Sequence, residues 1–269
     1  MSALNRPRRT ATSTDPSASL KPGGAHWVLR RPRLVAVLLS LVPVAFASIG
    51  FGAAQAQHLP ERTGLLITGA TMVLGGLVGL AVMGLARPPM TDFGLRRPTA
   101  MRSLLGFAPL LVAVLLVFIS GGVSIASALV PAYALVALGA ALNEEVWFRG
   151  LVLAALRPRG ARFAVIGQAI LFGVLHLANL AGGKSPTYAA LQLTFALLFG
   201  LVAGLVVVLS RSLWPAMAWH FAHDLVSYLG GDVVTTRTLI GLGLAVVVLA
   251  GYAVYLWRQL PADQTSQPA

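Results

Sequence analysis

Residues 187–209 have the sequence TYAALQLTFALLFGLVAGLVVVL, which contains no charged side chain over its whole length. A helix rises about 1.5 Å per residue, so a run of this length can cross the roughly 30 Å hydrocarbon core of a bilayer. Lipid offers no water to the backbone, and a helix satisfies its own N–H and C=O groups. The stretch therefore predicts a transmembrane helix.

Seven further apolar runs of similar length indicate that the chain crosses the membrane repeatedly. Residues 122–130 either extend the fourth span or form a short external turn, and Pro131 favours the turn. We find no alternating barrel pattern and no repeat of 20 to 50 residues. We expect an all-α fold, a polytopic transmembrane bundle of about eight helices. The predicted spans are 34–54, 64–86, 103–121, 131–156, 161–181, 187–209, 213–230 and 238–257.

The composition excludes several classes of protein. Hydrophobic residues make up 57% of the 269 residues and charged residues only 10%, whereas about a quarter of the residues in soluble domains are charged. This balance argues against a disordered chain, a nucleic-acid module and an ordinary cytosolic enzyme. The absence of cysteine excludes disulfides, thiolate metal sites and cysteine nucleophiles.

The net charge of +12 is explained by membrane topology. With the N-terminus inside, the tails and inner loops carry 16 of the 20 basic residues, and the outer loops carry only Arg62, Lys184 and Arg237. This bias is the one that the positive-inside rule describes. We expect a multi-pass protein of the cell membrane with both termini cytoplasmic. Its partners are then membrane lipid and not nucleic acid, and binding of anionic headgroups by the basic residues stays open.

The chain divides into four segments. Residues 1–33, rich in Pro, Ser, Thr and Arg, are expected to form a disordered basic cytoplasmic tail. Residues 34–121 hold the N-terminal transmembrane helices, and 131–230 hold the segment with most of the buried polar residues. Residues 231–269 supply the last transmembrane helix and a short tail.

Seven ionisable residues lie within the predicted spans, and they are concentrated in the fourth, fifth and seventh helices. A charge at membrane depth is costly and usually functional. Glu144, His176 and Asp224 each lie 13 or 14 residues from the basic inner end of their helix, which places all three about 20 Å from that end. We therefore expect one polar layer inside the bundle. The seven residues are Glu144, Glu145, Arg149, His176, His220, His223 and Asp224.

Spacing within each helix predicts which of these side chains meet. Glu145 and Arg149 are four residues apart and can pair on one helix face. His220 and Asp224 have the same spacing. Glu144 lies about 100° around the helix from Glu145, so we expect it to face a different neighbour.

This layer suits hydrolysis of an amide or ester at membrane depth. Glu144 is the candidate general base, and with His176 it can hold and activate a water molecule. His220 and the polar group at Asp224 can stabilise a developing oxyanion. The alternative is a zinc site with Glu144, His176 and His220 as ligands. The two-histidine zinc motif H-E-x-x-H is absent from the sequence.

Three motifs in this region resemble those of one protease family. Residues 144–149 (EEVWFR) are similar to the E-E-x-x-x-R motif of the CPBP (Abi) family of intramembrane proteases, which includes the type II CAAX prenyl endopeptidases. Residues 172–176 (FGVLH) resemble its F-x-x-x-H motif, and 220–224 (HFAHD) its H-x-x-x-N or H-x-x-x-D motif. The resemblance covers roughly residues 131–230.

The resemblance implies eight transmembrane helices and a CAAX-type endopeptidase that cleaves a membrane-associated protein or peptide. It assigns water activation to Glu144 and His176, the oxyanion site to His220 and Asp224, and supporting roles to Glu145 and Arg149. Both a glutamate-dependent mechanism without a cofactor and a zinc metalloprotease mechanism are compatible with the family. Position 224 carries Asp where eukaryotic members have Asn. Because an ionised Asp cannot donate a hydrogen bond, it is protonated, orients His220 or favours a metal.

Two functions of other classes compete with proteolysis. The chain can be a non-catalytic CPBP-fold scaffold or bacteriocin-immunity protein, since intact motifs do not prove turnover. It can also be a transporter in which the buried charges form a proton relay. The sequence shows neither inverted repeats nor interrupted spans that would favour a transporter.

Overall fold

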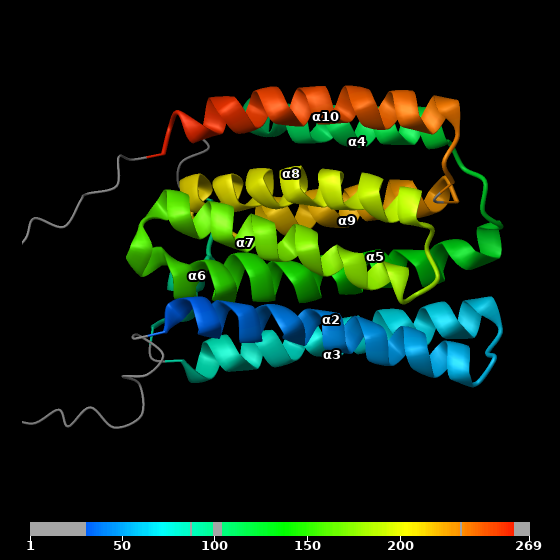
Figure 1. The fold of residues 1–269 in the computed structure, drawn as a ribbon, viewed down its shortest axis with the longest axis horizontal. Helices are drawn as coiled ribbons and strands as arrows, with labels where there is room; N and C mark the ends of the chain where they lie inside the picture. The colour runs from blue at the N-terminus through cyan, green and yellow to red at the C-terminus, as the bar shows by residue number, and fades with distance from the viewer. Residues whose placement is uncertain (1–30, 87, 99–103, 232, 261–269) are drawn as a thin grey trace, which may run out of the picture. The chain divides into compact units, whose positions relative to one another are not determined.

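Among the residues that the structure describes, eight successive helical passes, connected at alternating ends, form the bundle (Figure 1). The computed structural model describes residues 31–86, 88–98, 104–231 and 233–260. The α-helices are α2 (Pro32–Ala56), α3 (Glu61–Leu85), α4 (Ala108–Gly121), α5 (Val130–Glu144), α6 (Leu153–Leu156), α7 (Ala161–Leu175), α8 (Pro186–Ser210), α9 (Trp214–Leu229) and α10 (Thr236–Trp257).

Shorter helical segments interrupt or extend these passes. A π-helical segment, η4 (Glu145–Val152), joins α5 to α6 and makes one continuous pass with them. The 3-10 segments are η1 (Met90–Phe93), η2 (Leu104–Phe107), η3 (Ser127–Leu129), η5 (Arg157–Arg159) and η6 (His176–Leu180). The described residues contain no strand, so the prediction of an all-α bundle is confirmed.

The helices pack in layers (Figure 1). α2 and α3 lie together on one side, and α4 and α10 lie together on the other. The pass made by α5, η4 and α6 lies between them with α7, α8 and α9. α8 is the most buried of the long helices, and it contacts α7, α9, α10 and η4. The three passes that carry the predicted polar residues therefore lie in the interior layers.

Helix ends follow the local sequence. Pro131 stands in the first turn of α5, where its missing N–H costs no hydrogen bond, so residues 122–129 form a connection and not a longer span. The side chain of Ser185 caps α8 by accepting from the Tyr188 N–H. Thr235 and Thr238 form a reciprocal capping box at the start of α10. Each predicted span corresponds to one pass, with ends that differ by a few residues.

Six of the passes are long and apolar enough to cross a membrane, and two are shorter. α4 has 14 residues and α9 has 16, whereas each of the other passes contains a helical stretch of at least 20 residues. Many large apolar side chains on the outer helices are exposed, among them Ile49, Ile119, Ile240 and Val247. Exposure of this kind suits contact with lipid, and the protein is a multi-pass membrane protein.

Close packing of α3 against the central pass fixes the position of η4. A Cβ atom at Gly79 would lie 2.6 Å from Val146 Cγ1 and 3.0 Å from Trp147 Nε1. The Trp147 indole N–H donates to the Gly75 carbonyl oxygen over 2.9 Å. Only the absence of a side chain at these glycines lets α3 approach so closely.

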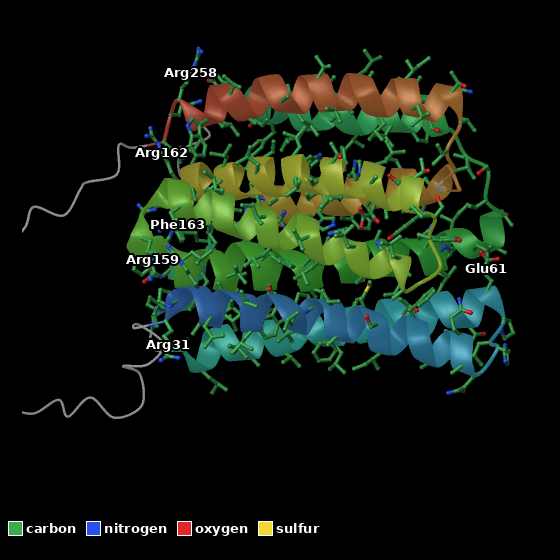
Figure 2. The ribbon with its side chains drawn as sticks, viewed as in Figure 1. Arg31, Glu61, Arg159, Arg162, Phe163 and Arg258 are labelled. Atoms are coloured by element: carbon green, nitrogen blue, oxygen red, sulfur yellow. The ribbon has the colours of Figure 1, made fainter. Side chains whose placement is uncertain are left out.

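Basic side chains collect at one end of the bundle. Figure 2 shows Arg159, Arg162 and Arg258 at the end where α6 meets α7 and where α10 finishes, while Glu61 lies at the opposite end. This is the distribution on which the predicted orientation depends. The predicted tail 1–33 lies almost entirely outside the described residues, as does most of the predicted C-terminal tail.

Candidate active site

The first motif lies where α5 changes from α-helical to π-helical winding. Glu144 is the last residue of α5 and Glu145 is the first residue of η4. In a π-helix the backbone bonds skip one further residue, which widens the turn and is common at functional sites. All eight residues of η4 are buried. The motif is therefore held on a widened, fully packed turn in the middle of the bundle.

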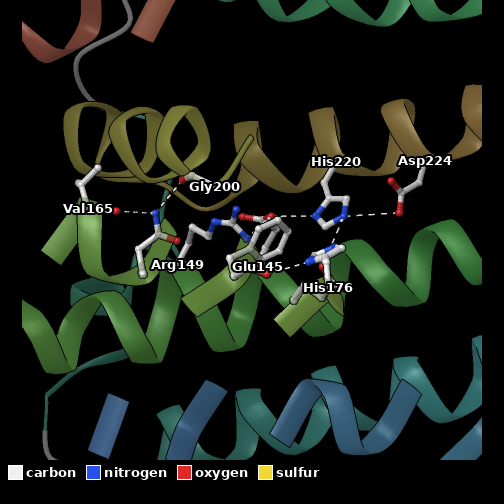
Figure 3. A network of polar contacts seen from close by, with 10 residues as sticks. Glu145, Arg149, Val165, His176, Gly200, His220 and Asp224 are labelled. Atoms are coloured by element: carbon white, nitrogen blue, oxygen red, sulfur yellow. Dashed lines mark hydrogen bonds and ion pairs between the residues drawn. The ribbon is translucent and has the colours of Figure 1, made fainter. Parts of the chain in front are cut away.

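Glu145 binds two cationic or protonatable groups at once. Its Oε1 lies 3.0 Å from Arg149 Nη1 and 2.8 Å from His220 Nδ1 (Figure 3). The side chains of Glu145 and Arg149 are completely buried, and that of His220 is nearly so. The predicted Glu145–Arg149 pair is thus present, and it also holds one face of the His220 imidazole.

The other nitrogen of His220 faces two more carboxylates. His220 Nε2 lies 3.4 Å from Asp224 Oδ2 and 3.8 Å from Glu144 Oε2. The expectation that Glu144 and Glu145 face different neighbours is wrong, because both reach the same imidazole from its two sides. A flat ring with nitrogens on opposite edges can insert between them, and an imidazolium can donate from both nitrogens.

His176 completes the layer from the end of α7. Its Nδ1 lies 2.7 Å from the Phe172 carbonyl oxygen, and a carbonyl only accepts, so Nδ1 carries the hydrogen. In the neutral ring the lone pair then resides on Nε2, which can accept from a water molecule. Figure 3 shows the His176 ring beside that of His220. The charge interaction between His176 and Glu144 agrees with this proximity.

Aromatic rings enclose the polar groups. The Phe172 ring lies 4.0 Å from the Arg149 guanidinium carbon and 4.6 Å from the His176 ring centroid. The Phe199 ring stacks on Trp219 at 4.0 Å and meets the edge of the His220 ring at 4.9 Å. Such walls exclude water and strengthen the electrostatic interactions inside. His223 stacks against the Phe195 ring at 4.7 Å.

The structure brings together all six residues that the sequence singled out as catalytic or supporting. Sequence reasoning overlooked Gln168, which is fully buried in α7. Its amide nitrogen donates to the Val165 and Gly200 carbonyl oxygens over 3.1 and 2.7 Å, and it ties α7 to α8. Figure 3 shows Val165 and Gly200 to one side of Arg149. The signal was available, because Gln168 is the one polar residue in the apolar stretch 163–175.

A zinc site formed by Glu144, His176 and His220 stays a prediction. In the described part of the chain no three His, Asp or Glu side chains are placed to hold one metal ion. The two nitrogens of His220 face carboxylates, and His176 Nδ1 is bonded to a carbonyl. Carbonyl and carboxylate contacts of this kind also orient zinc-bound imidazoles, so zinc stays the alternative to the mechanism proposed below, which uses side chains alone.

The segment that contains the site matches a known protein family. Residues 126–226 match the family described as type II CAAX prenyl endopeptidase Rce1-like. These residues form a CAAX protease domain of the CPBP family. No curated protein matches the chain.

The CPBP domain contains the whole site. The match begins just before α5 and ends within α9. It therefore includes Glu144, Glu145, Arg149, His176, His220 and Asp224. α2, α3, α4 and α10 lie outside it. These flanking helices enclose the CPBP domain without contributing any of the six side chains.

Proposed function

We propose that this protein is an intramembrane endopeptidase that hydrolyses a peptide bond of a membrane-associated protein or peptide. One observation carries the proposal. Glu144 and Asp224 lie within 3.8 and 3.4 Å of one imidazole nitrogen of His220, beside His176, in an interior layer of the bundle. The family match at residues 126–226 supports a CAAX-type endopeptidase.

Glu144 and His176 are the pair that activates water. The Glu144 carboxylate takes a proton from water as the water oxygen bonds to the scissile carbonyl carbon. His176 Nε2 accepts the second hydrogen of that water and orients it. The protonated Glu144 then gives its proton to the leaving nitrogen as the C–N bond breaks. A side chain that first removes and then returns the proton needs no cofactor.

His220 stabilises the oxyanion that forms in the tetrahedral intermediate. Glu145 accepts from the Nδ1–H, and in the imidazolium form the Nε2–H is then directed toward Glu144 and Asp224 at the centre of the site. A donor that is already in place loses nothing to reorganisation when charge develops, which is where the catalytic gain arises. Asp224, at 3.4 Å from Nε2, serves to orient His220. This role explains an Asp at position 224 without requiring it to donate.

The substrate class follows from the location of the site and from the family. A site in a buried layer of helices is reached by a segment that enters the membrane. Rce1-like proteins are described as type II CAAX prenyl endopeptidases, so CAAX-type C-terminal peptides, with and without a prenyl group, are the first substrates to test. We place the protein in the cell membrane, with lipid as its surrounding partner.

The test is a cleavage assay with the full chain in liposomes. We expect Glu144→Gln to lower kcat by about 10²–10⁴-fold, because it removes the general base while keeping the size of the side chain. The matched control is Glu61→Gln, at the far end of the bundle, where a Gln oxygen can still accept from the Tyr133 hydroxyl. Unchanged turnover in Glu144→Gln would sink the mechanism. If neither the parent nor the control variant cleaves any of these peptides, a scaffold role is favoured.

A further inference from the structure

A second polar feature of the bundle is a cavity at its basic end. The cavity has a volume of about 280 Å³. It lies between the η1 connection, the segment from η4 to η5, and the turn from α8 to α9. Its charged lining consists of Asp92, Arg96, Arg149, Arg157 and Arg211. None of the proposed catalytic steps uses this space.

The charges that line the cavity are not balanced. Four guanidinium groups face a single carboxylate, and the charges of both Arg211 and Asp92 act on Arg157. Within the residues that the structure describes, Arg96, Arg157 and Arg211 form no ion pair. Like charges gathered around a small space are stabilised when an anion enters it.

Arg149 supplies an independent sign that the cavity suits an anion. It lines the cavity although it is 1% exposed. Its one ion pair is with Glu145, and its Nε and Nη2 atoms have no hydrogen-bond partner among the described residues. A buried guanidinium normally satisfies its five donors. An anion in the cavity would supply the acceptors that the protein does not.

The backbone around the cavity is fixed by bonds between distant segments. The Leu213 N–H donates to the Gly94 carbonyl oxygen over 2.9 Å, and the Ser212 hydroxyl donates to the Arg96 carbonyl oxygen over 2.6 Å. These bonds hold the segment between α3 and α4 that contains η1 against the turn from α8 to α9. Arg96 and Arg211 are therefore placed on the same cavity by the fold and not by chance side-chain positions.

We propose that this cavity binds a phosphate group, from an anionic lipid headgroup or from free phosphate. The planar fork of each guanidinium matches two phosphate oxygens, and several forks around one space suit a compact, multiply charged anion. The cavity also lies at the end of the bundle where lipid headgroups are expected. The proposal is independent of whether the protein cleaves peptides.

Binding is measured with the full chain purified in a neutral detergent. Inorganic phosphate and a short-chain phosphatidylglycerol are titrated in separate arms, with isothermal calorimetry as the readout. We expect saturable binding in at least one arm, and the arm that saturates identifies the source of the phosphate. Removing two guanidinium groups with Arg96→Gln/Arg211→Gln should weaken binding about tenfold or more, the scale of lost charge-assisted bonds.

A second variant tests the location without removing charge. Ala154 lines the cavity, and Ala154→Leu would fill part of it, so binding should weaken here as well. The matched control is Arg258→Gln, an exposed arginine at the same end of the bundle that does not line the cavity; it should bind as the parent does. Absence of saturable binding in both arms, or parental affinity in either cavity variant, would overturn the proposal.

Discussion

At the scale of single residues, Glu145 is the group on which the site depends structurally. It is completely buried between Arg149 and His220, and it is within 3.0 Å of both. Glu145→Gln replaces the carboxylate with a neutral amide of similar size, and it would leave the buried Arg149 charge without its counter-ion. We expect this change to destabilise the protein by about 3–5 kcal/mol, the usual cost of breaking a buried pair from one side. The thermal midpoint in detergent measures the change.

A double variant separates the structural role of Glu145 from its role in the site. Glu145→Gln/Arg149→Met removes both charges and keeps similar volumes, and replacing a whole buried pair is often neutral for stability. We expect the double variant to recover most of the lost stability. Cleavage should stay impaired, because His220 Nδ1 still lacks the Glu145 carboxylate. Parental stability in Glu145→Gln alone would contradict the pairing.

At the scale of elements, glycine packing between α3 and the central pass keeps η4 in place. We expect Gly79→Leu to lower the thermal midpoint and to reduce cleavage, because a side chain there collides with Val146 and Trp147. Overpacking a tight contact costs about 1–3 kcal/mol. Gly84→Leu in the same helix is the control, since no described atom lies within 4 Å of a Cβ at that position. Equal effects of the two variants would show that the contact is unimportant.

The same elements show what the sequence could and could not predict. Apolar run lengths and Pro131 give the eight passes, because span length and helix breaking are local properties. The π-helical turn at Glu145 was not predicted, since a change from α to π winding depends on what the side chains meet in the fold. For that reason the sequence placed Glu144 against a different neighbour, whereas both carboxylates meet His220. The roles of the six site residues stay predictions.

At the scale of the whole molecule, the remaining question is which end of the bundle faces the cytoplasm. The basic loops and both helix termini next to the tails lie at one end, with Arg159, Arg162 and Arg258. Transferring so many positive charges across the membrane is disfavoured. We therefore expect both termini to be cytoplasmic and the connection between α2 and α3 to be outside.

The natural absence of cysteine allows a direct test of this orientation. Gln57→Cys lies in the connection after α2 and Gln259→Cys lies just after α10, and both positions are exposed. In intact cells a membrane-impermeant maleimide should label the cysteine at position 57 and not the one at 259. After permeabilisation both should react, which controls for access. Labelling of position 259 alone in intact cells would show the opposite orientation. The phosphate cavity would then face the outer leaflet, where anionic headgroups are scarcer.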